Sequence, residues 1–163
     1  MGFFDKIKSM KNAMTGGGAK VHVEVGNATL AGPFPVKVTA MIDDADIKID
    51  AVYLLVRAVE EVKVEGASVT RQVREKLGDA VESVSFGMIE DDEETCDIRV
   101  NIDGPQELKA GETYTFEGEV TLPQGSRPSF EGRKCRHTWT IQAGLDAFGN
   151  DPDSGWVRFT VTG

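Results

Sequence analysis

The chain has 163 residues, of which 40% are hydrophobic, and its 18 Lys and Arg residues against 27 Asp and Glu residues give a formal net charge of −9. A chain of this length buries enough surface to fold on its hydrophobic core alone, so neither a disulfide nor a structural metal is needed for stability. The excess of carboxylates repels phosphate backbones, which excludes a general nucleic-acid-binding protein.

The charge is distributed unevenly along the chain. Residues 1–20 carry a net charge of +3, and the rest of the chain carries −12. No stretch reaches the ~18 apolar residues of a membrane span, and the first residues lack the continuous apolar run of a secretion signal. We therefore expect a cytoplasmic protein in which Cys96 and Cys135 stay reduced.

The first residues predict a short amphipathic helix. Within residues 3–14, four apolar side chains recur at spacings of four, three and four, and the lysines lie largely off this stripe. The apolar residues are Phe3, Ile7, Met10 and Met14. Glycines 16–18 end the helix and form a joint, so we divide the chain into residues 1–18 and a single domain over residues 19–163. The stripe could pack on the protein's own domain, on a partner or second copy, or on a membrane surface. The net negative charge of the rest of the chain disfavours an anionic membrane.

Beyond the joint the hydrophobic period changes to two. Alternation of apolar and polar residues predicts strands with one buried and one solvated face. These strands cover residues 21–25, 34–42, 47–62, 96–102, 112–122, 137–145 and 157–161. Residues 47–62 are apolar on both faces, which is typical of a strand near the middle of a sheet. With turns rich in Gly, Pro and Asp between them, the strands predict an all-β fold, a two-sheet antiparallel, immunoglobulin-like β-sandwich.

Residues 66–94 fit two structures. Apolar residues from Val69 to Val84 recur at helical spacing behind a Ser68 cap, whereas residues 80–88 alternate as in a strand. We favour a β-hairpin with its turn at Gly78-Asp79. The acidic run from Glu90 to Glu94 is then expected to be a solvated loop.

The sequence contains no nucleophile elbow, zinc-protease helix, phosphate-binding loop or dinucleotide fingerprint. Cys135 and His137 project to the same side of a strand, but a zinc site would also need Cys96 and His22, and no pair has a spacing that sets the geometry. A Cys-His nucleophilic pair on one strand does not converge on a substrate, so a hydrolase ranks last. We expect no enzyme activity, no catalytic residue and no cofactor.

The acidic loops offer an alternative function. Carboxylates at 43–46, 90–94 and 146–153 could bind calcium where two loops meet at one end of the sandwich. None of these loops matches the twelve-residue calcium loop, and solvated turns that blunt sheet edges are the competing interpretation. A calcium-dependent binding module therefore stays as the alternative.

Two regions resemble a known family. The stretch from Leu122-Pro123 through Pro128-Ser129-Phe130-Glu131-Gly132 to the strand over 137–143 resembles the latter half of an arrestin-type N-terminal lobe. Phe3-Phe4 with nearby lysines, the glycine joint and Ala19-Lys20-Val21 are similar to the bacterial sporulation-control proteins, which share the arrestin fold. The Gly32-Pro33 turn departs from the family pattern, and the chain is long enough for one lobe where these proteins have two. The resemblance implies an arrestin-like sandwich that binds other proteins and performs no chemistry.

We therefore expect a non-enzymatic adaptor or regulatory module, of the kind used in bacterial signalling or sporulation-type control, that binds a protein partner and no nucleic acid. The contact residues expected from the sequence are Phe3, Phe4, Ile7, Met10, Met14, Phe130 and Phe148. For Phe130 the competing interpretation is a plug that closes one end of the core. Weak membrane contact through the helix and a homodimer through edge strands or swapped helices stay open.

Overall fold

A computed structural model describes residues 18–71 and 83–163 of the chain. Within these ranges the chain forms eleven strands joined by turns, and no helix. The described segments accordingly contain no helix with the length and apolarity needed to cross a bilayer. The helix expected over residues 3–14 lies outside the described residues.

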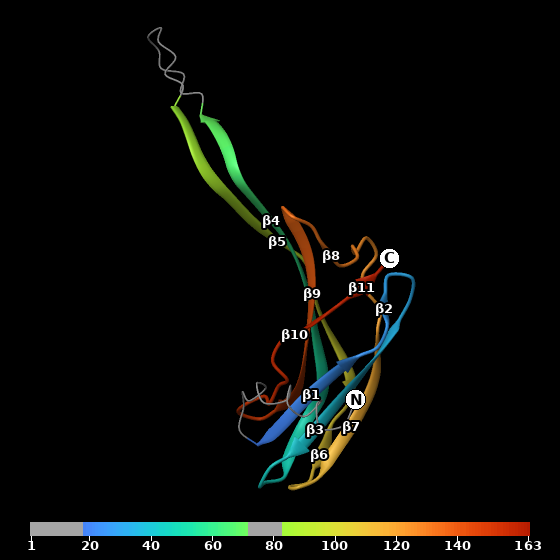
Figure 1. Cartoon of the computed structure of the whole chain (residues 1–163). Coiled ribbons are helices and arrows are strands. Elements are labelled where there is room, and N and C mark those ends of the chain that lie inside the picture. Colours follow the sequence, from blue (N-terminus) through green and yellow to red (C-terminus); the bar gives the residue numbers. More distant parts are fainter. Residues whose placement is uncertain (1–17, 72–82) are drawn as a thin grey trace, which may run out of the picture.

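Two antiparallel sheets face each other and confirm the two-layer β-sandwich (Figure 1). The larger sheet has the strand order β10-β9-β4-β5, with β6 added at the start of β4 and β8 at the start of β9. Its strands are β4 (Ile47–Arg71), β5 (Ser83–Asp103), β6 (Gln106–Leu108), β8 (Phe130–Glu131), β9 (Cys135–Ala147) and β10 (Val157–Phe159). The smaller sheet has the order β1-β3-β7, formed by β1 (Ala19–Val25), β3 (Phe34–Ile42) and β7 (Thr113–Val120).

One pair of short strands departs from the antiparallel expectation. The predicted strand over 157–161 is divided, because its end forms β11 (Val161–Thr162), which runs parallel to β2 (Ala28–Thr29). The segment that follows β1 in the chain thus pairs with residues 161–162. This pair closes one end of the sandwich.

The hydrophobic core lies between the two sheets, where alternation along each strand directs every second side chain inward. Trp139 on β9 is 1% exposed and packs against Phe159, which in turn contacts Phe34 of the smaller sheet, at ring-centroid distances of 6.2 and 5.9 Å. The largest fully buried side chains of the described residues are Trp139, Phe34, Leu54, Leu108, Ile141, Leu145, His137, Val36, Val38, Val52, Val56 and Val120. Burial of a single Leu, Ile, Val or Phe side chain contributes about 1.5–3 kcal/mol, so this layer is the main source of stability.

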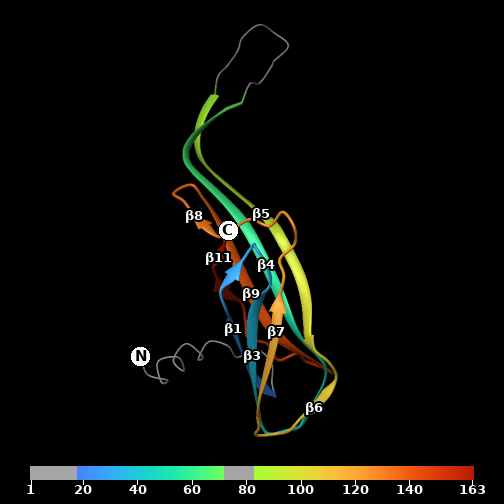
Figure 2. The ribbon, with the colours of Figure 1, turned by 90° about the vertical axis from the view of Figure 1, so that its right-hand side faces the viewer.

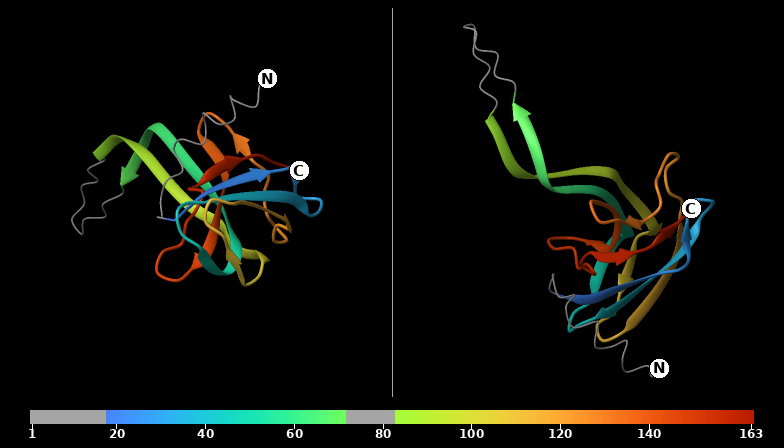
Figure 3. Two further views of the ribbon diagram at one scale, coloured as in Figure 1. Left: turned by 90° about the horizontal axis from the view of Figure 1, so that it is seen from below. Right: turned by 45° about the horizontal axis from the view of Figure 1, so that its top comes forward.

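β4 and β5 form the hairpin that the sequence favoured over a helix. They pair antiparallel from Val52 with Asp103 to Arg71 with Ser83, whereas β9 follows β4 only as far as Val62. The two strands therefore continue beyond Cys135, the first residue of β9, as a two-stranded arm, which projects from the sandwich in Figures 1, 2 and 3. The expected turn at Gly78-Asp79 lies outside the described residues.

The expectation of a loop at Glu90 to Glu94 was wrong. These five exposed residues belong to β5 and pair with β4 from Val59 to Lys63. Because β5 is the edge strand at the base of the arm, both of its faces reach water there, and no apolar alternation is required to hold the strand in place. The charges mark a solvated sheet edge.

Candidate protein-binding surface

The face of the larger sheet that points away from the smaller sheet is here called the outer face. Arg57 on β4 lies on it, since its neighbours Val56 and Ala58 are both fully buried in the core. The same alternation places Leu55 and Val59 on this face, where both are half-buried. The outer face thus carries apolar side chains that the smaller sheet does not cover.

An exposed tryptophan next to an arginine forms the centre of this surface. Trp156 directly precedes β10, and it points outward because Val157 pairs with the inward Ile141. The Arg57 guanidinium lies 4.7 Å from the centroid of the Trp156 ring, and Trp156 is 42% exposed. This cation-π contact supports the ring, which stays partly exposed to solvent.

Carboxylates of β5 border this centre. The Arg57 Nε atom lies 3.5 Å from Glu94 and 3.6 Å from Asp97, so one cation is shared between two acids. The register also places Asp92 opposite Glu61 and Glu90 opposite Lys63 on the same face. The outer face of β5 therefore forms an acidic row, composed of Glu90, Asp92, Glu94 and Asp97.

A closed polar cluster anchors one end of the outer face. The Tyr53 ring packs over Gly144 of β9 and beneath the Arg99 guanidinium, which lies 4.1 Å from the ring centroid. Arg99 donates a 2.7 Å hydrogen bond to Asp146, and the Tyr53 hydroxyl donates to Asp151 at 3.5 Å. Burial, followed by the charge of Asp151, raises the pKa of the Tyr53 hydroxyl above its usual value.

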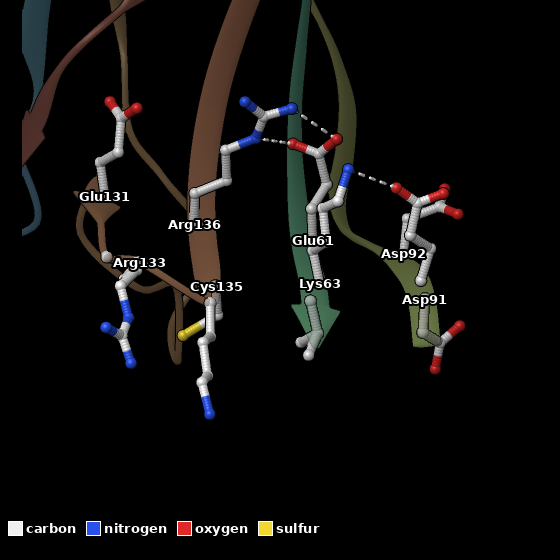
Figure 4. Close-up of a pocket in the computed structure, with 12 residues that line it drawn as sticks. Glu61, Lys63, Asp91, Asp92, Glu131, Arg133, Cys135 and Arg136 are labelled. Atoms are coloured by element: carbon white, nitrogen blue, oxygen red, sulfur yellow. Dashed lines mark hydrogen bonds and ion pairs between the residues drawn. The ribbon is translucent and has the colours of Figure 1, made fainter. Parts of the chain in front are cut away.

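A charged cleft of about 580 Å³ lies at the other end, where β9 begins and the arm leaves the sheet (Figure 4). Its walls hold two ion pairs, Arg136 with Glu61 and Lys63 with Glu90. The hydrogen bonds from Arg136 hold the pKa of the Glu61 carboxyl below its usual value. Besides these two pairs the cleft is lined by charged side chains of both signs, so it offers charge to a polar ligand.

The structure gives both ring nitrogens of His137 hydrogen-bond partners other than cysteine. His137 is 1% exposed, and its ring nitrogens lie 3.0 Å from the Pro128 carbonyl and 2.7 Å from the Thr95 hydroxyl. Neither nitrogen is left to activate Cys135, which lines the cleft. In the part of the chain that the structure describes, no group of three or more His, Cys, Asp or Glu side chains could hold a metal ion.

Carboxylates of the acidic loops have hydrogen-bond partners within the fold. Asp46 accepts hydrogen bonds from the Ala110 backbone N–H and from Lys109, both at 2.9 Å. Asp151 accepts from the Ala147 backbone N–H, and Asp153 from that of Gly155. These contacts fix turns, and nothing in them favours the calcium alternative.

The structure does not bring the contact residues expected from the sequence into one surface. Phe130 is paired with His137 near the start of β9, and it is 42% exposed, so the plug interpretation was wrong. Phe148 follows the other end of β9 and is fully exposed. At about 3.3 Å per residue, the length of β9 separates the two rings. Phe3, Phe4, Ile7, Met10 and Met14 lie outside the described residues, and their contacts stay predictions.

Arg57 and Trp156 were missed by the sequence analysis. One signal for the surface was present, because residues 47–62 are apolar on both faces although only one face can meet the opposite sheet. A second signal was the alternation along residues 156–159, which places Trp156 on the face opposite to Val157 and Phe159. The contact between Arg57 and Trp156 itself depends on the register of β4, β9 and β10, which the sequence does not display.

Comparison with known proteins shows the fold. The chain is similar to the crystal structure of Spo0M, a sporulation control protein from Bacillus subtilis, with a TM-score of 0.55 and 17% sequence identity over 90% of this chain and 50% of that one. No family model matches the sequence. No curated protein matches it either. The chain thus spans about half the length of this structural relative, and the likeness confirms the arrestin-type sandwich expected from the sequence.

Proposed function

We propose that this chain is a non-enzymatic protein-binding module of a regulatory system, of the sporulation-control kind, and that the outer face of the larger sheet is its contact surface. The observation that carries the proposal is the exposed Trp156 ring supported by Arg57, beside the half-buried Leu55 and Val59. Tryptophan and arginine are the residue types that most often dominate binding energy at protein interfaces. The fold-level likeness to a sporulation control protein supports a regulatory role.

The composition of the surface indicates the chemistry of the partner. An apolar and aromatic centre bordered by charged side chains is the usual anatomy of a specific protein contact. The acidic row of β5 favours a partner with Lys or Arg beside an apolar or aromatic anchor. A predominantly acidic partner would place like charges in opposition at this edge.

Affinity capture from the source cells, followed by titration of the captured protein, tests the proposal. Trp156→Ala is expected to weaken the partner's affinity by about thirtyfold, because truncating a central interface residue costs about 2 kcal/mol. Phe148→Ala is the matched control, since that ring is fully exposed on the loop after β9 and no ring or cation-π contact of the described residues involves it. If the Phe148 variant loses the partner while the Trp156 variant keeps it, the outer face is not the contact surface.

A further inference from the structure

The outer face presents two neighbouring strips of different chemistry. The apolar strip follows β4 and β10 and consists of Leu55, Val59 and Trp156. The acidic row of β5 runs alongside it, because Val59 pairs with Glu94 and Arg57 with Asp97. A segment that covers this face needs an apolar stripe next to positive charge.

The acidic row is only partly neutralised. Arg57 approaches both Glu94 and Asp97, at distances of 3.5 and 3.6 Å that are long for ion pairs. Asp92 is exposed, and within residues 18–71 and 83–163 no ion pair involves it. Additional cations would therefore gain favourable interactions along this row.

The chain carries a complementary segment in its own first residues. Residues 3–14 place Phe3, Ile7, Met10 and Met14 at the spacing of one helical stripe, and Lys6, Lys8 and Lys11 accompany them. With Asp5 as the only acid, this segment carries a net charge of +2. Its composition combines the two properties that the outer face lacks, apolar cover and positive charge.

The point of attachment places this segment within reach. The described chain begins at Gly18, next to Ile47 at the start of β4, and Ile49 pairs with Ala147 at the end of β9. In Figures 1 and 3 the start of β1 accordingly lies beside the loop over 148–155, which leads directly to Trp156.

The segment is also long enough to cross the outer face. Three strand spacings of about 4.8 Å separate β10 from β5, roughly 14 Å. A helix over residues 3–14 would be about 18 Å long, which is sufficient to cross them.

We propose that residues 3–14 lie across the outer face of the larger sheet in the free protein, with their apolar stripe on Trp156, Leu55 and Val59 and their lysines toward the acidic row. This placement makes the segment an internal competitor for the surface assigned to the partner. The consequence for partner binding rests on the proposed function, but the docking itself does not and is measured without any partner.

Acrylamide quenching of tryptophan fluorescence measures the docking in the full chain. Of the two tryptophans, Trp139 is 1% exposed and Trp156 is 42% exposed, so Trp156 supplies the quenchable signal. Ile7→Glu combined with Met10→Glu places charge on the stripe, and we expect at least a twofold rise in the quenching constant. Ser9→Glu combined with Asn12→Glu adds the same charge off the stripe and is the matched control.

Two results would overturn the docking. One is an unchanged quenching constant in the stripe variant, and the other is an equal rise in the control variant. A Trp156→Phe background must abolish the difference between the variants, because Trp139 is buried whether or not the segment is bound. If the difference survives in that background, the reporter does not sense the outer face and the proposal fails.

The acidic row is tested separately. Asp92→Asn combined with Asp97→Asn should raise the quenching constant toward that of the stripe variant, since Glu94 remains to hold Arg57 in place. Glu117→Gln combined with Glu119→Gln removes the same charge from exposed positions on β7 of the smaller sheet and should leave the constant unchanged. Equal effects of the two double variants would show that net charge, and not the acidic row, is responsible.

A second copy of the chain is the competing source of the segment. Docking within one chain predicts a quenching constant that does not change on dilution from micromolar to nanomolar protein. Protection that disappears on dilution assigns the segment to a second copy and contradicts the proposal. If docking is observed but the Trp156 variant binds the partner normally, the proposed function fails while this inference stands.

Discussion

The contact between Tyr53 and Gly144 shows how one small residue shapes the outer face. A Cβ atom placed on Gly144 would lie 2.3 Å from Tyr53 Cζ, and the ring cannot retreat because Arg99 lies on its other side. The alternation of β9 identifies position 144 as outward facing, but only the register with β4 shows that an aromatic ring occupies the space.

Gly144→Ala should therefore destabilise the protein by about 1–3 kcal/mol, the usual cost of overpacking a filled site. Chemical denaturation measures the free energy of unfolding. Gly104→Ala is the control, since nothing lies within 4 Å of its added methyl group and its backbone is not in the left-handed region. A Gly144 variant as stable as the Gly104 variant would show that the Tyr53 ring is not fixed over β9.

Asp46 connects two turns at the end of the sandwich and gives the fold a dependence on pH. The backbone N–H of Ala110, followed by the Lys109 ammonium, holds the pKa of the Asp46 carboxyl below its ordinary value of 3.8. Because the folded pKa is depressed, the stabilisation is present above the unfolded pKa and is lost as the pH falls through the folded value.

Asp46→Asn should consequently lower the melting temperature at pH 7, and the difference from the wild type should shrink as the pH falls below about 4. Asp44→Asn, in the same turn, is the control because no hydrogen bond or ion pair of the described residues involves it. Thermal melts across this pH range supply the measurement. A difference that stays constant down to acid pH would contradict the assignment.

At the scale of elements, two aromatic side chains of β9 hold the segment between β7 and β8 over the end of the core. The Trp139 indole N–H donates a 3.0 Å hydrogen bond to the Arg127 carbonyl, and His137 Nδ1 donates to the Pro128 carbonyl. Since a carbonyl only accepts, Nδ1 carries the proton in this arrangement. The carbonyls of the neighbouring residues Arg127 and Pro128 thus accept hydrogen bonds from two side chains on the same face of β9.

His137→Leu removes this hydrogen bond and leaves the Pro128 carbonyl and the Thr95 hydroxyl without their ring partner. The expected loss is about 1–3 kcal/mol of folding free energy, because two part-buried hydrogen bonds are lost, each contributing about 0.5–1.5 kcal/mol. The control is His22→Leu on β1, whose imidazole is partly exposed. Urea unfolding compares the two variants, and equal small losses would mean that the His137 ring does not hold the segment.

Sequence periodicity identified the strands because most of them have one face in the core. It was less informative at 90–94, where β5 is an edge strand that reaches water on both faces and therefore shows no alternation. Apolar periodicity alone ended β4 at residue 62 and only the favoured hairpin extended it, since beyond Val62 it pairs with β5 alone. Strand boundaries are predictable from the sequence where a second sheet imposes burial, and not where a ribbon leaves the sandwich.

At the scale of the whole molecule, the candidate surface results from bringing distant segments together. Arg57 and Trp156 are separated by most of the domain in sequence, and the order β10-β9-β4-β5 places them in contact. The two-layer fold was predictable from hydrophobic pattern and family resemblance. The surface was not, because an exposed aromatic residue has the same appearance in a sequence whether or not an arginine supports it.

Isothermal titration of the purified partner into wild-type protein and into the Arg57→Ala, Trp156→Ala double variant addresses the protein-binding role directly. We predict saturable binding to the wild type and a dissociation constant about thirtyfold larger for the double variant. Circular dichroism should show both proteins equally folded. Unchanged affinity in a folded double variant would contradict binding through the outer face of the larger sheet.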